Sequence, residues 1–187
     1  MWIIGTHNGV RGKFSRIDID DYPAVKAHLD QYWDKIAVRD DQGATPYNLR
    51  NCAYWEDFDE HKIIWKIIGS RLAFTIDTSG TMVNNACYIM TGNELHHILG
   101  FLNSSPLIWY SEITNKNKTG VGDSQVGAQN IILFPVPHII SDEVKEYVQS
   151  LLKNPQDQAL YQQLNKHVYN VYGLSHDEIQ YLEALNL

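Results

Sequence analysis

The sequence predicts an α+β fold, in which a mixed β-sheet core with packed helices leads into a helical C-terminal section. Three observations indicate this class. Apolar, β-branched and aromatic runs typical of strands gather between positions 62 and 90. Segments with apolar residues at helical spacing lie on both sides of these runs, and beyond Pro137 the pattern is helical to the end. We therefore expect an α+β core over 1–138 and a helical section over 139–187, packed on or beside it.

The expected elements before residue 60 are a strand, a loop and a helix. Residues 2–5 read W-I-I-G and predict a short strand, and the glycines of 5–12 predict a loop after it. Pro23 suits the first turn of a helix, and apolar residues recur after it at helical spacing. We expect this helix to end near Arg39, before a polar segment.

The central part predicts a β-hairpin, a third strand and a capped helix. Residues 62–68 and 72–77 would pair through the short segment between them, and a further strand is expected over 86–90. Thr91 and Glu94 have the spacing of a capping box, which predicts the start of a helix through 95–102. The elements expected after this helix are a helix over 106–113, a loop over 115–123, a strand over 131–134, and helices over 141–153, 158–172 and 175–185, the last with a Ser175/Glu178 capping box.

Composition is that of a protein with a real hydrophobic core. Hydrophobic residues make up 44% and charged residues 20% of the chain, which are ordinary values for a folded domain. No window approaches the apolar length of a membrane helix, and the start lacks the features of a signal peptide. Cys52 and Cys87 show no metal-ligand spacing. We therefore expect a reduced, cytoplasmic protein.

Nine short stretches follow one another in an order that matches a known family. They are W-I-I-G-T-H-N-G-V (2–10), Y-P (22–23), Y-N-L-R-N-C-A-Y-W (47–55), K-I-I-W-K-I-I (62–68), R-L-A-F-T-I-D (71–77), C-Y-I-M-T-G-N-E-L (87–95), F-L-N-S (101–104), F-P-V-P (134–137) and V-Y-G-L-S (171–175). Together they resemble the C-terminal specificity domain of the TaqI-like adenine-specific DNA methyltransferases and of the fused type II restriction–modification enzymes related to them.

This resemblance implies a target-recognition domain for double-stranded DNA. In that family methyl transfer and cleavage belong to other domains, so the chain is expected to be non-catalytic by itself and to hold no cofactor. Its partner would be an N-terminal methyltransferase or nuclease domain of the same polypeptide or complex. S-adenosylmethionine would bind in that missing part, and Mg²⁺ would bind there too if a nuclease is present. The sequence itself contains no Asn-Pro-Pro-Tyr methylation motif.

A domain that recognises DNA bases needs side chains with forked hydrogen-bond donors. Binding to the DNA phosphates needs Lys, Arg, Ser or Thr. Two predicted loops and the flanks of the predicted sheet supply these residue types. The candidate DNA-binding residues are His7, Asn8, Arg11, Lys13 and Arg16 in the first loop, Lys116, Asn117, Lys118, Thr119, Ser124 and Gln125 in the loop over 115–129, and Arg50, Lys66 and Arg71 beside the sheet. The net charge of −7 opposes DNA binding, but ten of the fifteen basic residues lie between Arg11 and Arg71. A local basic surface is therefore still expected.

Two other functions stay open from the residues alone. A protein-interaction module could use the many Trp and Tyr residues to dock another subunit. A small Mg²⁺-dependent nuclease could use Glu60 and Lys62, which form an E-x-K at the head of a predicted strand, with Asp40 or Asp41 upstream. E-x-K tripeptides are common, so the nuclease is the less favoured alternative.

Overall fold

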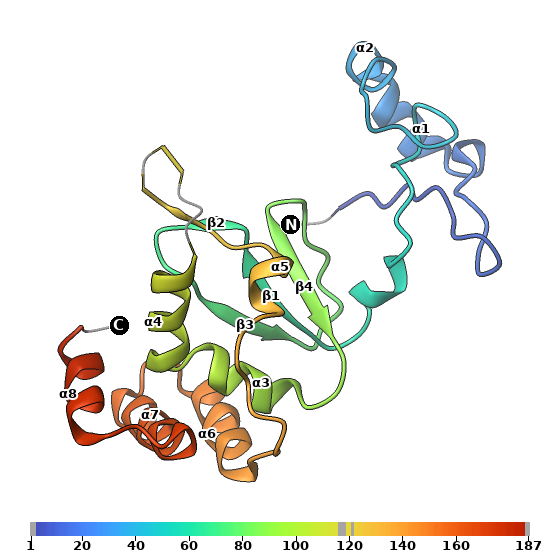
Figure 1. Cartoon of the computed structure of the whole chain (residues 1–187). Helices are drawn as coiled ribbons and strands as arrows, with labels where there is room; N and C mark the ends of the chain where they lie inside the picture. Colours follow the sequence, from blue (N-terminus) through green and yellow to red (C-terminus); the bar gives the residue numbers. More distant parts are fainter. Residues whose placement is uncertain (1–2, 116–118, 121, 186–187) are drawn as a thin grey trace. The chain divides into compact units, whose positions relative to one another are not determined.

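The computed structural model describes residues 3–115, 119–120 and 122–185. The chain divides into two compact units, Met1–Phe58 and Asp59–Leu187 (Figure 1). The α+β class is confirmed, since helices and short strands both occur in the chain. Position 139, where we expected the helical section to begin, falls inside the second unit, and that boundary stays a prediction.

The first unit is made of short helices and irregular segments. Its elements are the 3-10 helix Ile19–Asp21, α1 (Pro23–Asp30), α2 (Trp33–Ile36) and the 3-10 helix Trp55–Phe58. The expected strand over 2–5 is wrong for its described part, because residues 3–5 are irregular; Trp2 lies outside the described residues. The expected helix from Pro23 to Arg39 is two helices, because the backbone at Tyr32 (φ −115°, ψ 19°) leaves the helical region. The ring of Tyr32 contacts His28 edge-on.

Polar side chains hold much of the first unit together. Asn48 is buried, and its Nδ2 donates a hydrogen bond of 2.9 Å to the carbonyl oxygen of Ile17. Buried Thr6 donates from Oγ1 to the carbonyl oxygen of Tyr47 at 2.7 Å. Because these bonds join segments about thirty or forty positions apart in the chain, they fix the fold of the unit where apolar burial is small.

The second unit contains a three-stranded antiparallel sheet. Its strands are β1 (Lys62–Lys66), β3 (Phe74–Asp77) and β4 (Cys87–Thr91), in the order β3-β1-β4. Strands β2 (Ile68–Gly69) and β5 (Ser124–Gln125) form a separate antiparallel pair. The hairpin and the third strand are confirmed. A mixed sheet is not observed, because every ladder among the described residues is antiparallel; the β1–β3 connection is too short for the crossover that parallel strands need.

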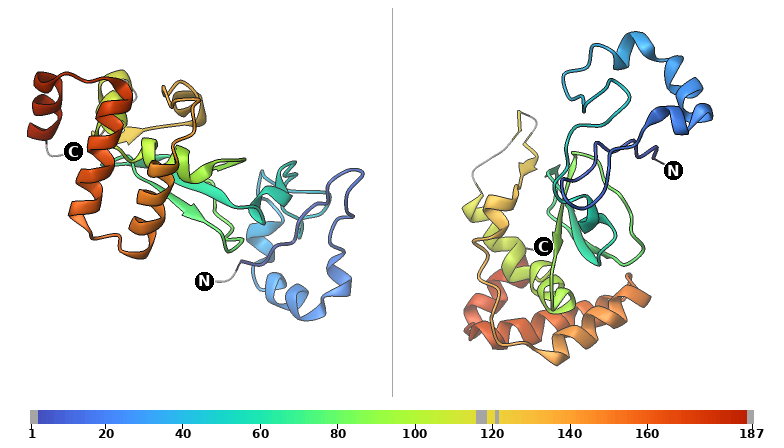
Figure 2. Two further views of the ribbon diagram at one scale, coloured as in Figure 1. Left: turned by 90° about the horizontal axis from the view of Figure 1, so that it is seen from below. Right: turned by 90° about the vertical axis from the view of Figure 1, so that its right-hand side faces the viewer.

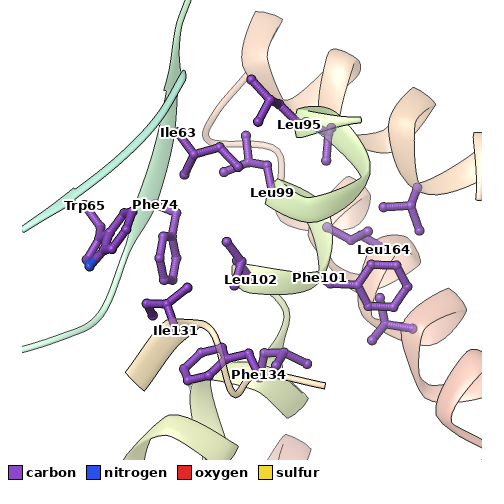
Figure 3. Close-up of a cluster of buried hydrophobic side chains, with 14 of the residues drawn as sticks. Ile63, Trp65, Phe74, Leu95, Leu99, Phe101, Leu102, Ile131, Phe134 and Leu164 are labelled. Carbon is purple, nitrogen blue, oxygen red and sulfur yellow. The ribbon is translucent and has the colours of Figure 1, made fainter. Parts of the chain in front are cut away.

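The helix α3 (Leu95–Leu102) lies at the centre of the second unit. It is apolar on nearly all sides, which is typical of a helix covered by other elements. Figure 3 shows Leu99 and Leu102 on the side of Ile63 and Phe74 from the sheet, and Phe101 on the side of Leu164 from the C-terminal helices. The core of this unit therefore joins the sheet to the helices through α3.

The described part of the second unit contains five more helices: α4 (Ser105–Thr114), α5 (Ala128–Ile131), α6 (Asp142–Lys153), α7 (Gln158–Tyr172) and α8 (His176–Ala184). The predictions for α4, α6, α7 and α8 are confirmed. Helix α8 begins with the expected Ser175/Glu178 capping box. Figure 2 shows α6 and α7 side by side, and both contribute buried residues to the core.

Two local predictions in the second unit are wrong. Thr91 ends β4, and the residue before α3 is Glu94 in the left-handed region, so they form no capping box. The expected strand over 131–134 is the end of α5 and a turn. Ile131 and Phe134 are buried while the two residues between them are exposed, which is a helical rather than a strand pattern.

Candidate nucleic-acid interface

The first predicted DNA-binding loop forms a tight hairpin over residues 8–16. Val10 and Phe14 pair across it through two backbone hydrogen bonds of 3.0 and 3.1 Å. Gly9 (φ 76°) and Gly12 (φ 80°) take the left-handed conformation that favours glycine. A Cβ atom at Gly9 would lie 2.6 Å from the backbone nitrogen of Arg16, so only glycine fits there. The two glycines thus set the shape of the segment that carries the basic residues.

An open groove of about 890 Å³ runs along this hairpin, and we call it the hairpin groove. It is lined by residues 8–16 of the hairpin, by Ala44 and by residues 51–53. Among the predicted site residues, the structure brings Asn8, Arg11, Lys13 and Arg16 together in its lining. The groove is therefore a concave surface with three cationic side chains along one segment.

The three cations of the hairpin groove differ in their partners. Within the described chain, Arg11 and Arg16 are exposed and have no ion-pair partner. Lys13 forms a hydrogen-bonded ion pair with Glu56, and this bond raises the pKa of Lys13. The two guanidinium groups are thus available to an incoming anion, whereas the ammonium group of Lys13 is engaged.

His7 and Asn8 support the hairpin. The Asn8 side chain accepts from the backbone nitrogen of Ala44 at 2.8 Å and donates to Oδ1 of Asn51. The ring of His7 contacts both Phe14 and Trp55, and its Nδ1 accepts a hydrogen bond from the backbone nitrogen of Gly9. Both side chains are used within the protein, where they hold the loop in place.

The other predicted residue of the first unit, Arg50, is paired. Its Nη1 lies 3.3 Å from Oδ1 of Asp41, and both side chains are largely exposed. Surface pairs of this kind are weak, so the pair can open for a stronger anion. Arg50 does not line the hairpin groove.

The remaining predicted residues lie in the second unit, near the β2–β5 pair. Ser124 and Gln125 form β5 and are not in a loop as expected; Gln125 pairs with Ile68 in β2. Lys66 ends β1, and Arg71 lies just after β2; both are exposed. Lys116, Asn117 and Lys118 lie outside the described residues.

Thr119 is part of a local turn in the same region. Its Oγ1 accepts a hydrogen bond from the backbone nitrogen of Asp123 at 3.1 Å, and its own N–H donates to the Asp123 carbonyl at 2.8 Å. Asn115 donates from Nδ2 to the carbonyl oxygen of Gln125 at 3.2 Å. The base of this segment is therefore tied to β5.

Of the residues in the nuclease alternative, Lys62 has a structural role in the sheet. Lys62 is fully buried at the start of β1, and its Nζ lies 2.7 Å from Oδ2 of Asp77 on β3. Burial alone would raise the pKa of Asp77, but the hydrogen bonds from Lys62, Ser79 and Thr81 outweigh it and hold this pKa well below the usual range. Glu60 is exposed, and its backbone carbonyl accepts from Lys62. The lysine of the E-x-K is thus occupied by a structural ion pair.

Sequence reasoning missed the second wall of the hairpin groove. Asn51 and Cys52 line it, although they lie about forty positions beyond the hairpin. The paired asparagines Asn8 and Asn51 are visible in the sequence, but no local signal joins them. The contact is set by tertiary folding alone.

The chain matches the family model of the TaqI-like C-terminal specificity domain over residues 21–136. This match covers more than half of the chain. The chain belongs to the TaqI-like specificity domain family. It is thereby a DNA-binding domain of the restriction–modification kind. The matched residues contain the β2–β5 pair and the 51–53 wall of the hairpin groove, while the hairpin itself precedes them.

No group of three or more His, Cys, Asp or Glu side chains in the described part is arranged to hold a metal ion. None of the helices that the structure describes combines the length and the apolar character of a membrane span.

Proposed function

We propose that this chain selects specific sequences in double-stranded DNA for an adenine-N6 methyltransferase, or a methyltransferase fused to an endonuclease, and performs no chemistry itself. Membership of the TaqI-like specificity domain family supports the DNA-reading role. The methyltransferase or nuclease domain would lie elsewhere in the same polypeptide or complex. S-adenosylmethionine, and Mg²⁺ where a nuclease is present, would bind in that partner in the cytoplasm.

The observation that carries the proposal is the hairpin groove, whose Arg11 and Arg16 guanidinium groups have no ion-pair partner among the described residues. A guanidinium group is a planar fork that binds two acceptors at once, either two phosphate oxygens or the O6 and N7 edge of guanine. Arg11 and Arg16 lie on a segment whose shape is fixed by Gly9 and by the Asn8 bonds. A fixed segment loses little conformational freedom on binding, which favours affinity and register.

The β2–β5 region provides the second contact in this proposal. Lys66 and Arg71 are exposed cations next to β2, and β5 brings the polar residues Ser124 and Gln125 beside this strand. We propose that these cations bind phosphates, while Arg11 and Arg16 approach base edges. The target adenine would be flipped out of the duplex into the pocket of the partner domain.

Salt-dependent binding to duplex DNA tests the proposal. The affinity of the 187-residue chain for a labelled duplex is measured by fluorescence anisotropy at several salt concentrations. Each phosphate contact contributes about 0.9 to the slope of log affinity against log salt. The Arg11→Gln/Arg16→Gln variant should weaken binding at least ~10-fold, through lost phosphate or base contacts.

Lys35→Gln is the matched control for charge. Lys35 is an exposed lysine of α2 that does not line the groove and has no ion-pair partner among the described residues. Its replacement should leave the affinity nearly unchanged. The double variant removes two cations and Lys35→Gln removes one, so equal losses per removed charge would mean that only net charge matters, and the groove would then have no special role.

A further inference from the structure

A second groove, of about 490 Å³, lies between α4, α7 and α8, and we call it the aromatic groove. Figure 1 shows these three helices next to one another at the C-terminal end of the second unit. The aromatic side chains that line the groove are Trp109, Tyr110, Tyr172 and Tyr181. Trp109 and Tyr181 meet edge to face, with ring centroids 6.4 Å apart. Tyr181 is nevertheless 56% exposed, so this pair leaves aromatic surface open to a ligand.

The rim of the aromatic groove is acidic. Asp177 and Glu178 from the first turn of α8 line it. The backbone and side-chain hydrogen bonds from Ser175 lower the pKa of Glu178, so this carboxylate stays ionised at neutral pH. Asp177 has no ion-pair partner in the part of the chain that the structure describes. Helix α8 contains no Lys or Arg.

The aromatic lining and the acidic rim determine which kind of ligand the aromatic groove can bind. Two carboxylates repel the phosphates of DNA, so this groove is unsuited to the ligand of the hairpin groove. Aromatic faces and nearby carboxylates together suit a cationic side chain, which stacks on the rings and directs its charge to the rim. The polar tip of Tyr172 is already used, because its hydroxyl donates to the carbonyl of Pro135 at 3.0 Å. The interior of the groove therefore offers mainly apolar and aromatic contacts.

We propose that the aromatic groove binds a segment of a partner protein, which inserts an arginine or lysine side chain flanked by apolar residues. Trp and Tyr are enriched in protein–protein interfaces, where their rings supply large contact areas at low entropy cost. The complementary charge at the rim sets the orientation of the segment and excludes acidic competitors. This inference does not depend on DNA binding by the hairpin groove.

Peptide selection on the whole chain tests the proposal. A phage library of short random peptides is first passed over the Tyr181→Ala variant, which removes the peptides that bind it. The remaining phage are then selected on the wild-type chain. We expect enriched peptides that carry Arg or Lys next to apolar residues. A synthetic copy of such a peptide should bind the wild-type chain and lose at least ~10-fold in affinity with Tyr181→Ala, as for an aromatic interface anchor. Asp177→Asn should weaken binding and reduce its dependence on salt.

Matched variants separate the groove from general effects. Tyr54 in the first unit is 55% exposed, as Tyr181 is, so Tyr54→Ala controls for loss of a surface tyrosine. Asp34 holds the second position of α2, as Asp177 does in α8, so Asp34→Asn controls for charge at a helix start. Neither control should change peptide affinity. Tyr181→Lys, which keeps a good helix-forming residue and brings a cation to the rim, should abolish binding while the fold is retained.

Several results would overturn the proposal. They are enrichment of peptides without basic residues, equal affinity for wild-type and Tyr181→Lys chains, or self-association of the chain that Tyr181→Ala abolishes. The last would identify the occupant as a second copy. DNA affinity measured on the same Tyr181 variants should be unchanged. A chain that binds the peptides but not DNA would refute the proposed function and leave this inference standing.

Discussion

Asp77 and Lys62 illustrate how one buried ion pair decides between two interpretations of the same residues. Lys62 has no exposed surface, and Asp77 also accepts hydrogen bonds from Ser79 and Thr81. Removing one member of a buried pair leaves the other charge unpaired at a cost of about 3 kcal/mol or more. The intact pair is therefore needed where β1 meets β3, and the structure explains the lysine of the E-x-K.

Asp77→Asn should lower the free energy of unfolding by about 3 kcal/mol at neutral pH. The folded-state pKa of Asp77 is depressed, so its ionised form contributes stability above its ordinary pKa near 4. That contribution is lost as the pH falls below about 4 toward the folded-state pKa. The difference between wild type and variant should therefore shrink in acid, as urea unfolding at a series of pH values would measure.

Asp41→Asn is the control for this experiment, because Asp41 pairs with Arg50 at an exposed site. Its effect should be within about 1 kcal/mol. If the free energy of unfolding differed between the wild type and Asp77→Asn by the same amount down to pH ~2, the proposed link between protonation of Asp77 and stability would be contradicted.

Glu56 is expected to restrain DNA binding through Lys13. Glu56→Gln removes the partner of Lys13 and frees its ammonium group for a phosphate. We expect tighter binding to duplex DNA and a steeper salt dependence, by about 0.9 in the slope. Asp20→Asn, which frees Lys26 in α1 in the same way, is the control for a lost negative charge. If Glu56→Gln and Asp20→Asn change the slope of log affinity against log salt equally, Lys13 has no specific role in DNA binding.

At the scale of elements, α3 and α6 pack at close range through Gly100. A Cβ atom at Gly100 would lie 2.3 Å from Cγ1 of Val144 and 3.0 Å from Cγ2 of Val148. Val144 is fully buried and has little room to move. The glycine is therefore required by the contact between the two helices.

Gly100→Ala should destabilise the second unit by up to about 2 kcal/mol, because overpacking costs about 1–3 kcal/mol and a gain of about 1 kcal/mol in helix propensity offsets part of it. Thermal or urea unfolding measures this change. Val144→Ala should restore part of the loss when combined with Gly100→Ala, which a double-mutant cycle would detect. Independent effects of the two substitutions would show that the clash is relieved elsewhere.

Elements with a strong local signal were predictable from the sequence, and long-range contacts were not. Ser175 and Glu178 indicate the start of α8, and the β-branched run from Lys62 indicates β1. The prediction of a strand over 131–134 was wrong because a short apolar run fits a strand and a helix turn equally well. His7 and Asn8 contact residues more than forty positions away in the chain, and no local sequence pattern predicts these contacts.

At the scale of the whole molecule, the chain separates two kinds of surface. The basic hairpin groove belongs to Met1–Phe58, while the acidic rim of the aromatic groove belongs to Asp59–Leu187. A net charge of −7 is compatible with DNA binding where cations are grouped locally, as Arg11, Lys13 and Arg16 are in the hairpin groove.

Selection of random DNA duplexes on the 187-residue chain, at a salt concentration near 0.15 M, tests the central claim most directly. The wild-type chain and Lys35→Gln should enrich one and the same sequence motif. Arg11→Gln/Arg16→Gln should lose that motif or change it at particular positions, since base contacts specify sequence and phosphate contacts do not. Enrichment of no motif by the wild-type chain, or of an unchanged motif by the arginine variant, would contradict sequence reading by the hairpin groove.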